Sequence, residues 1–147
     1  MPRVCAASGQ DLIAIRALLD RSGLPTSDLE SAWPEFAVIR ENDRVIAAGA
    51  LQRFGSSALL RSVVVAADRR GIGFGQAIVS ELERMAGAAQ ISRLVLLTQT
   101  AAEFFGQRGY RVIDRSTAPE DMRESEEFRS LCPSSATCMA KNLQGST

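Results

Sequence analysis

The segment Arg70-Gly71-Ile72-Gly73-Phe74-Gly75 combines residue types and spacing that could bind an anion. It follows the β-branched run Val63-Val64-Val65 and precedes residues with helical periodicity. Backbone N–H groups of such a loop, together with the positive end of the helix, can receive a phosphate, and glycines let the main chain approach it closely. A tight strand-to-helix turn without a ligand would use the same glycines. The spacing alone therefore leaves both interpretations open.

Two common phosphate-binding motifs do not fit this loop. A Walker loop would continue with Gly-Lys-Ser/Thr, which does not follow here. A dinucleotide fingerprint follows a strand of a parallel sheet, whereas the strand before this loop belongs to a series of hairpins. NAD binding is therefore the interpretation that the sequence favours least.

The composition restricts the available general bases and metal ligands. The chain has no His, which removes the commonest general base and the commonest metal ligand together. Cys5, Cys132 and Cys138 form an odd set without CxxC spacing, so neither secretion nor a disulfide framework is indicated. We expect no metal cofactor.

Length and charge bound the class of protein. The 147 residues suit one compact domain, 1–147, with its own core. The 17 basic residues are scattered and balanced by 17 acidic ones, which argues against nucleic-acid or membrane binding and favours a small-molecule or protein substrate. No apolar run approaches the length of a membrane helix, and no signal-like segment opens the chain. We predict a cytoplasmic location.

The periodicity of apolar residues predicts the elements that must position the loop. Strands are expected at 3–7, 36–40, 44–51, 58–65, 93–98, 110–113 and 136–140. Helices are expected at 12–19, 26–33, 73–86, 101–108 and 119–131, with Ser8 and Asp11 as the capping pair of the first. The loop thus connects a hairpin series to a strand–helix–strand crossover.

The run from Ser62 to Gly75 resembles the acetyl-CoA-binding motif of GNAT acetyltransferases, Arg/Gln-x-x-Gly-x-Gly/Ala. Arg70, Gly73 and Gly75 stand at its defined positions, and the segment 102–110 resembles the second block of that family. The resemblance implies an α/β fold of the α+β type. Its mixed central sheet would have about six to seven strands, flanked by about four helices and splayed between the fourth and fifth strands.

The same resemblance implies acetyl-CoA as co-substrate. The main chain of Val63–Val65 would pair with the pantetheine arm, and amides from Arg70 to Gln76 would hold the pyrophosphate. An N–H of Val64 or Val65 would stabilise the oxyanion, which gives Val64 a catalytic role. The implied cofactor-binding residues are Val63, Val64, Val65, Arg70, Gly71, Ile72, Gly73, Phe74, Gly75, Gln76, Thr98, Phe104 and Phe105.

A narrower resemblance bears on the acceptor. The segments 60–62, 97–105 and 127–136 resemble GNAT N-acetyltransferases of arsenic resistance, and the last is also similar to GNAT domains of N-acetylglutamate synthases. Both imply transfer to the amine of a small, acidic molecule, such as an amino acid or an arsenic-containing analogue. Arg61, alone among apolar and small neighbours, is a candidate ligand for the acidic group; the alternative is an exposed strand charge.

The sequence offers several candidates, each with an alternative role, for the residues that donate and accept protons. Many GNAT enzymes use a Tyr as general acid, but its position here is similar to that of Phe105, which has no proton to give. Tyr110 is a core aromatic or the missing acid. Cys132 is a proton donor, an arsenical-binding thiol or a small buried residue. Glu30 and Glu35 are candidate bases near the acceptor entrance, or solvated charges.

Two further functions compete with a small-molecule acetyltransferase. One is acetylation of a protein N-terminus or Lys, which requires an open peptide groove. The other is a catalytically weak GNAT protein that binds acyl-CoA or arsenicals, which the absent His and Phe105 suggest. Trp33 is a candidate for acceptor binding or for the contact of a homodimer.

Overall fold

The computed structural model describes residues 3–29, 34–131 and 135–143. By their internal contacts the residues form two compact units. Unit 1 comprises Met1–Gln52 and Leu60–Met85, and unit 2 comprises Arg53–Leu59 and Ala86–Thr147. Each unit is described by itself, and the expectation of one domain over 1–147 stays a prediction.

Seven strands are hydrogen-bonded in the order β1-β2-β3-β4-β5-β7-β6. The pairs β1–β2, β2–β3, β5–β7 and β6–β7 are antiparallel, whereas β4–β5 is parallel. This confirms the predicted mixed α/β class and its strand number. The strands are β1 Val4–Ala6, β2 Glu35–Glu41, β3 Arg44–Phe54, β4 Ser57–Val65, β5 Arg93–Thr98, β6 Arg111–Val112 and β7 Thr137–Asn142.

The helices follow the predicted order with one difference. The α-helices are α1 Leu12–Arg21, α3 Phe74–Ala88, α4 Ala102–Gly106 and α5 Glu120–Arg123. The predicted helix at 119–131 was wrong as a single element, because α5 ends at Arg123 and a separate π-helical turn covers Glu127–Leu131. The predicted helix at 26–33 lies partly outside the described residues. No helix in the described ranges is long and apolar enough to cross a membrane.

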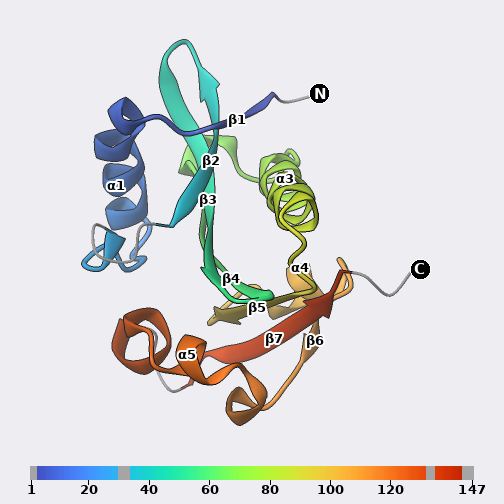
Figure 1. The fold of residues 1–147 in the computed structure, drawn as a ribbon. Coiled ribbons are helices and arrows are strands. Elements are labelled where there is room, and N and C mark those ends of the chain that lie inside the picture. Colours follow the sequence, from blue (N-terminus) through green and yellow to red (C-terminus); the bar gives the residue numbers. More distant parts are fainter. Residues whose placement is uncertain (1–2, 30–33, 132–134, 144–147) are drawn as a thin grey trace. The chain divides into compact units, whose positions relative to one another are not determined.

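Unit 1 is built on the hairpin of β2 and β3. Asn42 and Asp43 have φ values of 51° and 67°, the left-handed pair that a two-residue type I′ turn requires. Figure 1 shows α1 on one side of these strands and α3 on the other. The core of unit 1 consists of apolar residues from α1, β2, β3 and α3, including Ile15, Leu19, Val38, Ile46, Leu51, Ile78, Val79 and Leu82.

The predicted capping pair lies at the short 3₁₀-helix Gly9–Asp11, which leads directly into α1, and not at the first turn of α1 itself. Ser8 and Asp11 form a capping box, in which the Asp11 carboxylate accepts from the Ser8 backbone N–H at 2.7 Å. The Arg40 guanidinium also donates to Asp11 and lowers the pKa of that carboxyl below its usual value. This contact ties the entry of α1 to the end of β2.

A glycine in β3 sets how closely α3 packs. A Cβ at Gly49 would lie 2.5 Å from Ile78 Cγ2 and 2.9 Å from Leu82 Cδ1, both on α3. Such distances are well inside van der Waals contact, so α3 can rest at this depth only over a residue without a side chain. The depth of α3 in turn fixes where its N-terminus stands.

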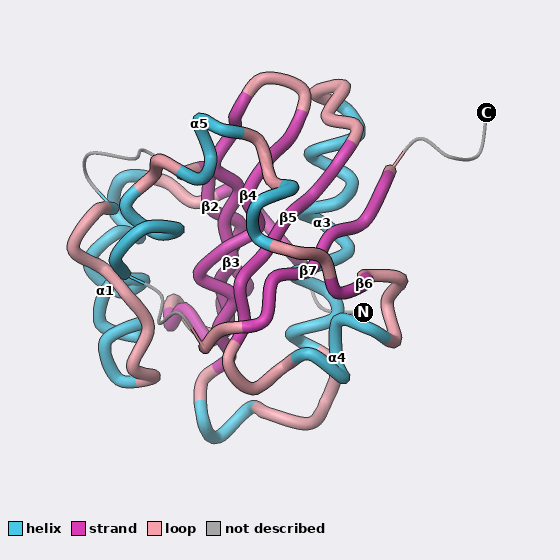
Figure 2. The backbone as a smooth tube through the Cα atoms, turned by 90° about the horizontal axis from the view of Figure 1, so that it is seen from below, coloured by secondary structure: helices cyan, strands magenta, loops and turns pink. Residues whose placement is uncertain are grey.

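Unit 2 contains the β5–β7–β6 ribbon, which Figure 2 shows side by side. Its parallel partner is the start of β4, where Ser57, Ala58 and Leu59 pair with Arg93, Leu94 and Val95. The predicted splay of the strands beyond this pairing concerns the arrangement of the two units and stays a prediction. The core of unit 2 is the cluster of Leu59, Val95, Ala118, Met122, Phe128, Cys138 and Ala140.

Replacing Gly49 with Ala should destabilise the protein by about 1–3 kcal/mol, because the new methyl group overlaps α3. Chemical denaturation of both proteins measures this difference. Gly87→Ala is the matched control: no neighbouring atom lies within 4 Å of its added Cβ, and it should stabilise α3 by about 0.5–1 kcal/mol. Equal stability of Gly49→Ala and wild type would contradict the packing described here.

Candidate functional site

The glycine-containing loop lies between β4 and α3, as the predicted order of strand, loop and helix requires. Gly71 and Gly73 have φ values of 83° and 94°, in the left-handed region that other residues rarely adopt. No atom lies within 4 Å of a Cβ built at either position, so the backbone angle rather than space requires glycine there. The Ile72 side chain between them is 63% exposed, an apolar group presented to solvent.

The N-terminus of α3 supplies a set of aligned donors. The first helical bond runs from Ala77 N to Gly73 O at 3.1 Å. The N–H groups of Phe74 and Gly75 precede it, in the first turn, where an α-helix offers no intrahelical acceptor. With the partial positive charge of a 15-residue helix, these groups form an environment that favours a phosphate.

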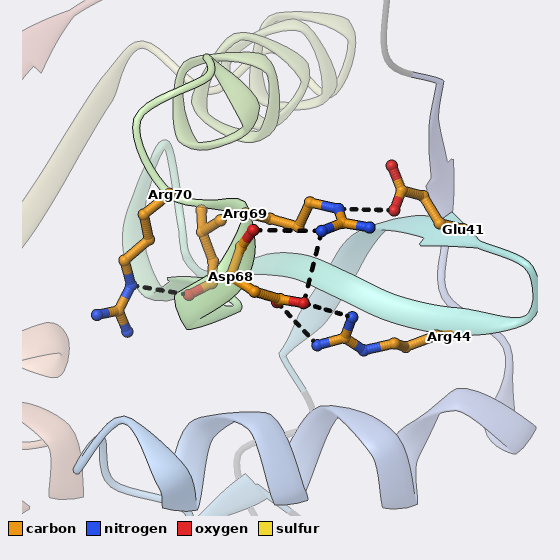
Figure 3. Close-up of polar contacts among 6 residues, drawn as sticks. Glu41, Arg44, Asp68, Arg69 and Arg70 are labelled. Atoms are coloured by element: carbon orange, nitrogen blue, oxygen red, sulfur yellow. Dashed lines mark hydrogen bonds and ion pairs between the residues drawn. The ribbon is translucent and has the colours of Figure 1, made fainter.

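Charged side chains surround the short 3₁₀-helix η2, Ala67–Arg69, just before the loop (Figure 3). Arg44 donates to both carboxylate oxygens of Asp68 at 3.1 and 3.0 Å and lowers the pKa of that carboxyl. Arg69 donates to Glu41 at 2.8 Å and also faces Asp68. These pairs are solvent-exposed and add little stability, but they neutralise two of the guanidinium groups near the loop.

The Arg70 side chain points away from these ion pairs (Figure 3). Its Nε donates to the carbonyl oxygen of Val65, the last residue of β4, at 3.1 Å (Figure 3). This bond closes the turn from strand to loop. Among the described residues, the terminal nitrogens of Arg70 have no carboxylate partner. The guanidinium of Arg21 has none there either.

A cavity of about 550 Å³ in unit 1 brings these groups together. It is lined by Leu18, Arg21, Ser22, Arg44, Ala66, Ala67, Asp68 and Arg70. The lining residues include three arginines and one aspartate, so they carry an excess of positive charge. Such a cavity favours a ligand with negative charge.

The strand Val63–Val65 leads into this region. Val64 is buried, whereas Val63 and Val65 are half-buried. Ala66 N donates to Ile46 O at 2.7 Å, which keeps the end of β4 beside β3. The roles assigned to the main chain of these three residues, including the oxyanion donor at Val64, stay predictions.

Arg61 is fully buried, so the alternative of an exposed strand charge was wrong. Its Nη1 and Nη2 donate to the two carboxylate oxygens of Asp28 at 2.6 and 2.7 Å. Nη1 also donates to Gln52 Oε1 at 2.9 Å, and Nε to Ser62 Oγ at 3.3 Å. The bidentate partner predicted for this guanidinium is thus a residue of the chain itself; binding of an acceptor stays a prediction.

Sequence reasoning missed Asp28 and Gln52 as partners of Arg61. Asp28 is 33 positions away in the sequence and lies beside Thr26 and Ser27, where an acidic residue resembles a helix cap. The available signal was Arg61 itself, since a lone charge within an apolar strand requires a buried counter-ion.

The second predicted block lies in unit 2. Phe105 and Tyr110 are buried with their rings edge to face at 5.4 Å, which favours the core-packing interpretation of Tyr110. The Thr98 hydroxyl accepts from Ala101 N at 3.0 Å and so begins the turn into α4. The Arg108 guanidinium stacks on the Phe104 ring at 3.7 Å. Cofactor contacts for Thr98, Phe104 and Phe105 stay predictions.

The remaining candidates divide into two groups. Glu30, Trp33 and Cys132 lie outside the described residues. Cys138 is buried in the core of unit 2, and burial raises the pKa of its thiol, as expected of a small core residue. Cys5 is half-buried in β1 of unit 1. In the described ranges no three His, Cys, Asp or Glu side chains are grouped to hold a metal.

Comparison with protein families identifies the class of protein. Residues 32–112 match the family model described as Acetyltransferase (GNAT) domain. The match covers more than half of the chain and includes the whole β4–loop–α3 segment, so the chain belongs to the GNAT acetyltransferase family.

Several known proteins are similar to this chain, among them two whose solved structures contain CoA. Rv2747 from Mycobacterium tuberculosis, solved in complex with CoA, is 28% identical, with a TM-score of 0.83 over 97% of this chain and 99% of that one. The N-acetylglutamate synthase of Neisseria gonorrhoeae, complexed with CoA and N-acetyl-glutamate, has a TM-score of 0.81 at 22% identity, over 97% of this chain and 35% of the synthase. At this level of identity, the likeness to the synthase shows a shared fold and nothing more.

An amino-acid acetyltransferase of Enterobacter sp. (strain 638) is 25% identical over 103 residues. These residues are 69% of this chain and 23% of that protein. The chain therefore spans about a quarter of the length of the curated relative that it matches.

Replacing Gly73 with Ala should weaken CoA binding by about tenfold, because an L-residue resists the left-handed conformation and the loop amides turn away. Isothermal titration of CoA into both proteins measures the dissociation constants. Since the added methyl group meets no atom, a loss would be due to the backbone. Unchanged affinity in a folded Gly73→Ala protein would contradict a role for this loop in anion binding.

Proposed function

We propose that this protein transfers the acetyl group of acetyl-CoA to the amine of a small, acidic molecule. The observation that carries the proposal is the loop at Gly71 and Gly73, left-handed at both glycines and followed directly by the N-terminus of α3. Membership of the GNAT family, which the match over 32–112 establishes, supports the reaction class.

Acetyl-CoA fits the groups that unit 1 presents. A pyrophosphate would bind the N–H groups of Gly71 to Gln76, which combine glycine backbone with the helix N-terminus. The pantetheine arm would pair with Val63–Val65 as an added strand. CoA in the structures of Rv2747 and of the gonococcal synthase supports this cofactor.

Two observations support an acidic acceptor. The gonococcal synthase, complexed with N-acetyl-glutamate, shares the fold. The cavity beside η2 carries excess positive charge, with Arg21 and Arg70 available to an anionic group. An amino acid or an arsenic-containing analogue fits this description, and arsenic resistance would be the biological context of the second. Trp33 remains a candidate for acceptor binding.

The reaction requires three events in the protein. The amine must arrive neutral and attack the acetyl carbon of the thioester, while an N–H of Val64 or Val65 stabilises the developing oxyanion. The departing thiolate of CoA must then take a proton from Cys132 or from solvent, and the amine must lose one, with Glu30 as a candidate base. Without His in the chain, correct positioning of amine and thioester would supply much of the rate enhancement.

One observation favours a second function, the binding of acyl-CoA with little turnover. Phe105 stands at the position that resembles the general-acid Tyr of many GNAT enzymes, and Tyr110 is buried against it. Neither ring is then available as a proton donor. Tight binding of CoA with no acetyl transfer to any amine would support this function.

The proposal predicts release of free thiol from acetyl-CoA in the presence of acidic amino acids or amino-arsenicals, measured across a panel of amines. Arg21→Gln should raise the KM for acidic amines by about tenfold through the loss of a charge-assisted contact. Neutral amines should be unaffected. Arg84→Gln is the control, because Arg84 pairs with Glu81 on the exposed face of α3. Preference for peptide substrates over all acidic amines would contradict the proposal.

A further inference from the structure

The ion pair between Arg61 and Asp28 is buried inside unit 1. The two side chains are 0% and 2% exposed, and Nη1 and Nη2 of the guanidinium meet the two carboxylate oxygens at 2.6 and 2.7 Å. The pair joins β4 to the segment before the acceptor candidates Glu30 and Trp33, and Gln52 adds a contact from β3. Three parts of unit 1 thus meet at one guanidinium.

Burying two charges is an expensive way to stabilise a fold. The desolvation of both groups cancels much of their attraction, so apolar residues of similar volume would serve stability as well. What the pair adds is direction, since a bidentate contact holds the guanidinium plane in a single orientation. A group that needs the guanidinium in this orientation should therefore lie among the neighbours of Arg61.

Ser62, the next residue, has a conformation that is unusual inside a strand. Its φ is 59°, in the left-handed region, although it is not glycine and lies within β4. The Arg61 Nε donates to the Ser62 hydroxyl at 3.3 Å. The guanidinium that Asp28 fixes therefore also holds the side chain of the strained residue.

The left-handed residue changes the course of β4. In a regular strand, alternate side chains share a face, but here Arg61 and Val64 are both buried and Ser62 and Val63 between them are half-buried. A left-handed residue within a strand can change which backbone N–H and C=O groups of the following residues face the neighbouring strand and which are presented outward.

We propose that Asp28 and Arg61 are positioning residues: their ion pair holds Ser62 in the left-handed conformation and so orients the main chain of Val63–Val65 toward the thioester and pantetheine arm. This inference rests on the proposed function in naming the ligand. It assigns Arg61 a role through Ser62 rather than a direct contact with the acceptor.

The test uses a substitution that removes the need for the ion pair. Arg61→Gln should weaken CoA binding and lower kcat/KM by about tenfold, because Ser62 then relaxes toward an ordinary strand conformation. Adding Ser62→Gly should restore most of both losses, since glycine adopts the left-handed conformation without steric cost. Ser62→Ala in the same background should restore neither. Asp28→Asn, which keeps shape but loses charge, should behave as Arg61→Gln does, and serves if the latter does not fold.

A ligand-free measurement separates this inference from the proposed function. The backbone amide chemical shifts of Val63–Val65 should move in Arg61→Gln and return toward wild-type values in the double variant. If they return while no variant binds CoA, the proposed function fails and the positioning role stands. The control is Arg40→Gln, which breaks the ion pair with Asp11 and should lower stability while leaving the affinity for CoA unchanged.

The opposite results would overturn the inference. A merely structural ion pair predicts that CoA affinity falls only in proportion to the fraction of unfolded protein. It also predicts that Ser62→Gly restores neither the affinity nor the amide shifts. Unchanged CoA affinity and amide shifts in folded Arg61→Gln would contradict the inference as well.

Discussion

The backbone from the middle of β4 to the start of α3 contains three residues in left-handed conformation, Ser62, Gly71 and Gly73. Ser62 resets the strand, and the two glycines turn the chain from the strand into the helix. Each proposed cofactor contact of unit 1 follows from one of these turns, because the groups concerned are main-chain N–H and C=O groups. The site therefore depends on backbone geometry, which glycine permits at two positions and a buried ion pair supports at the third.

The charges of unit 1 serve two different purposes. The exposed pairs around η2, such as Arg44 with Asp68, contribute little to stability because water screens them. Arg21 and Arg70 are the two further arginines of the cavity lining and give it excess positive charge. The buried pair of Arg61 with Asp28 contributes orientation. Because the charges beside η2 are exposed, they can reach a ligand. The buried pair cannot reach one and instead holds the backbone in place.

The sequence predicted what local patterns determine. The order of strand, glycine loop and helix, the two neighbouring strands at 36–40 and 44–51, and the periodicity of α3 all depend on residues close together in the chain. All three were confirmed, whereas the role of the loop stays a prediction. The left-handed Ser62 was not predictable, since its residue type carries no such preference, and neither was its link to Asp28, 33 positions before Arg61. The broken helix at 119–131 shows that a charged, helix-favouring segment does not fix its own ends.

The loop from Gly71 to Gln76 is proposed to hold the pyrophosphate of acetyl-CoA. A crystal structure of the protein with CoA would decide whether it does. We expect phosphate oxygens at about 3 Å from the N–H groups of this loop and of the first turn of α3. If CoA were bound with its pyrophosphate elsewhere, and the loop amides faced only solvent, the loop would not be the cofactor site.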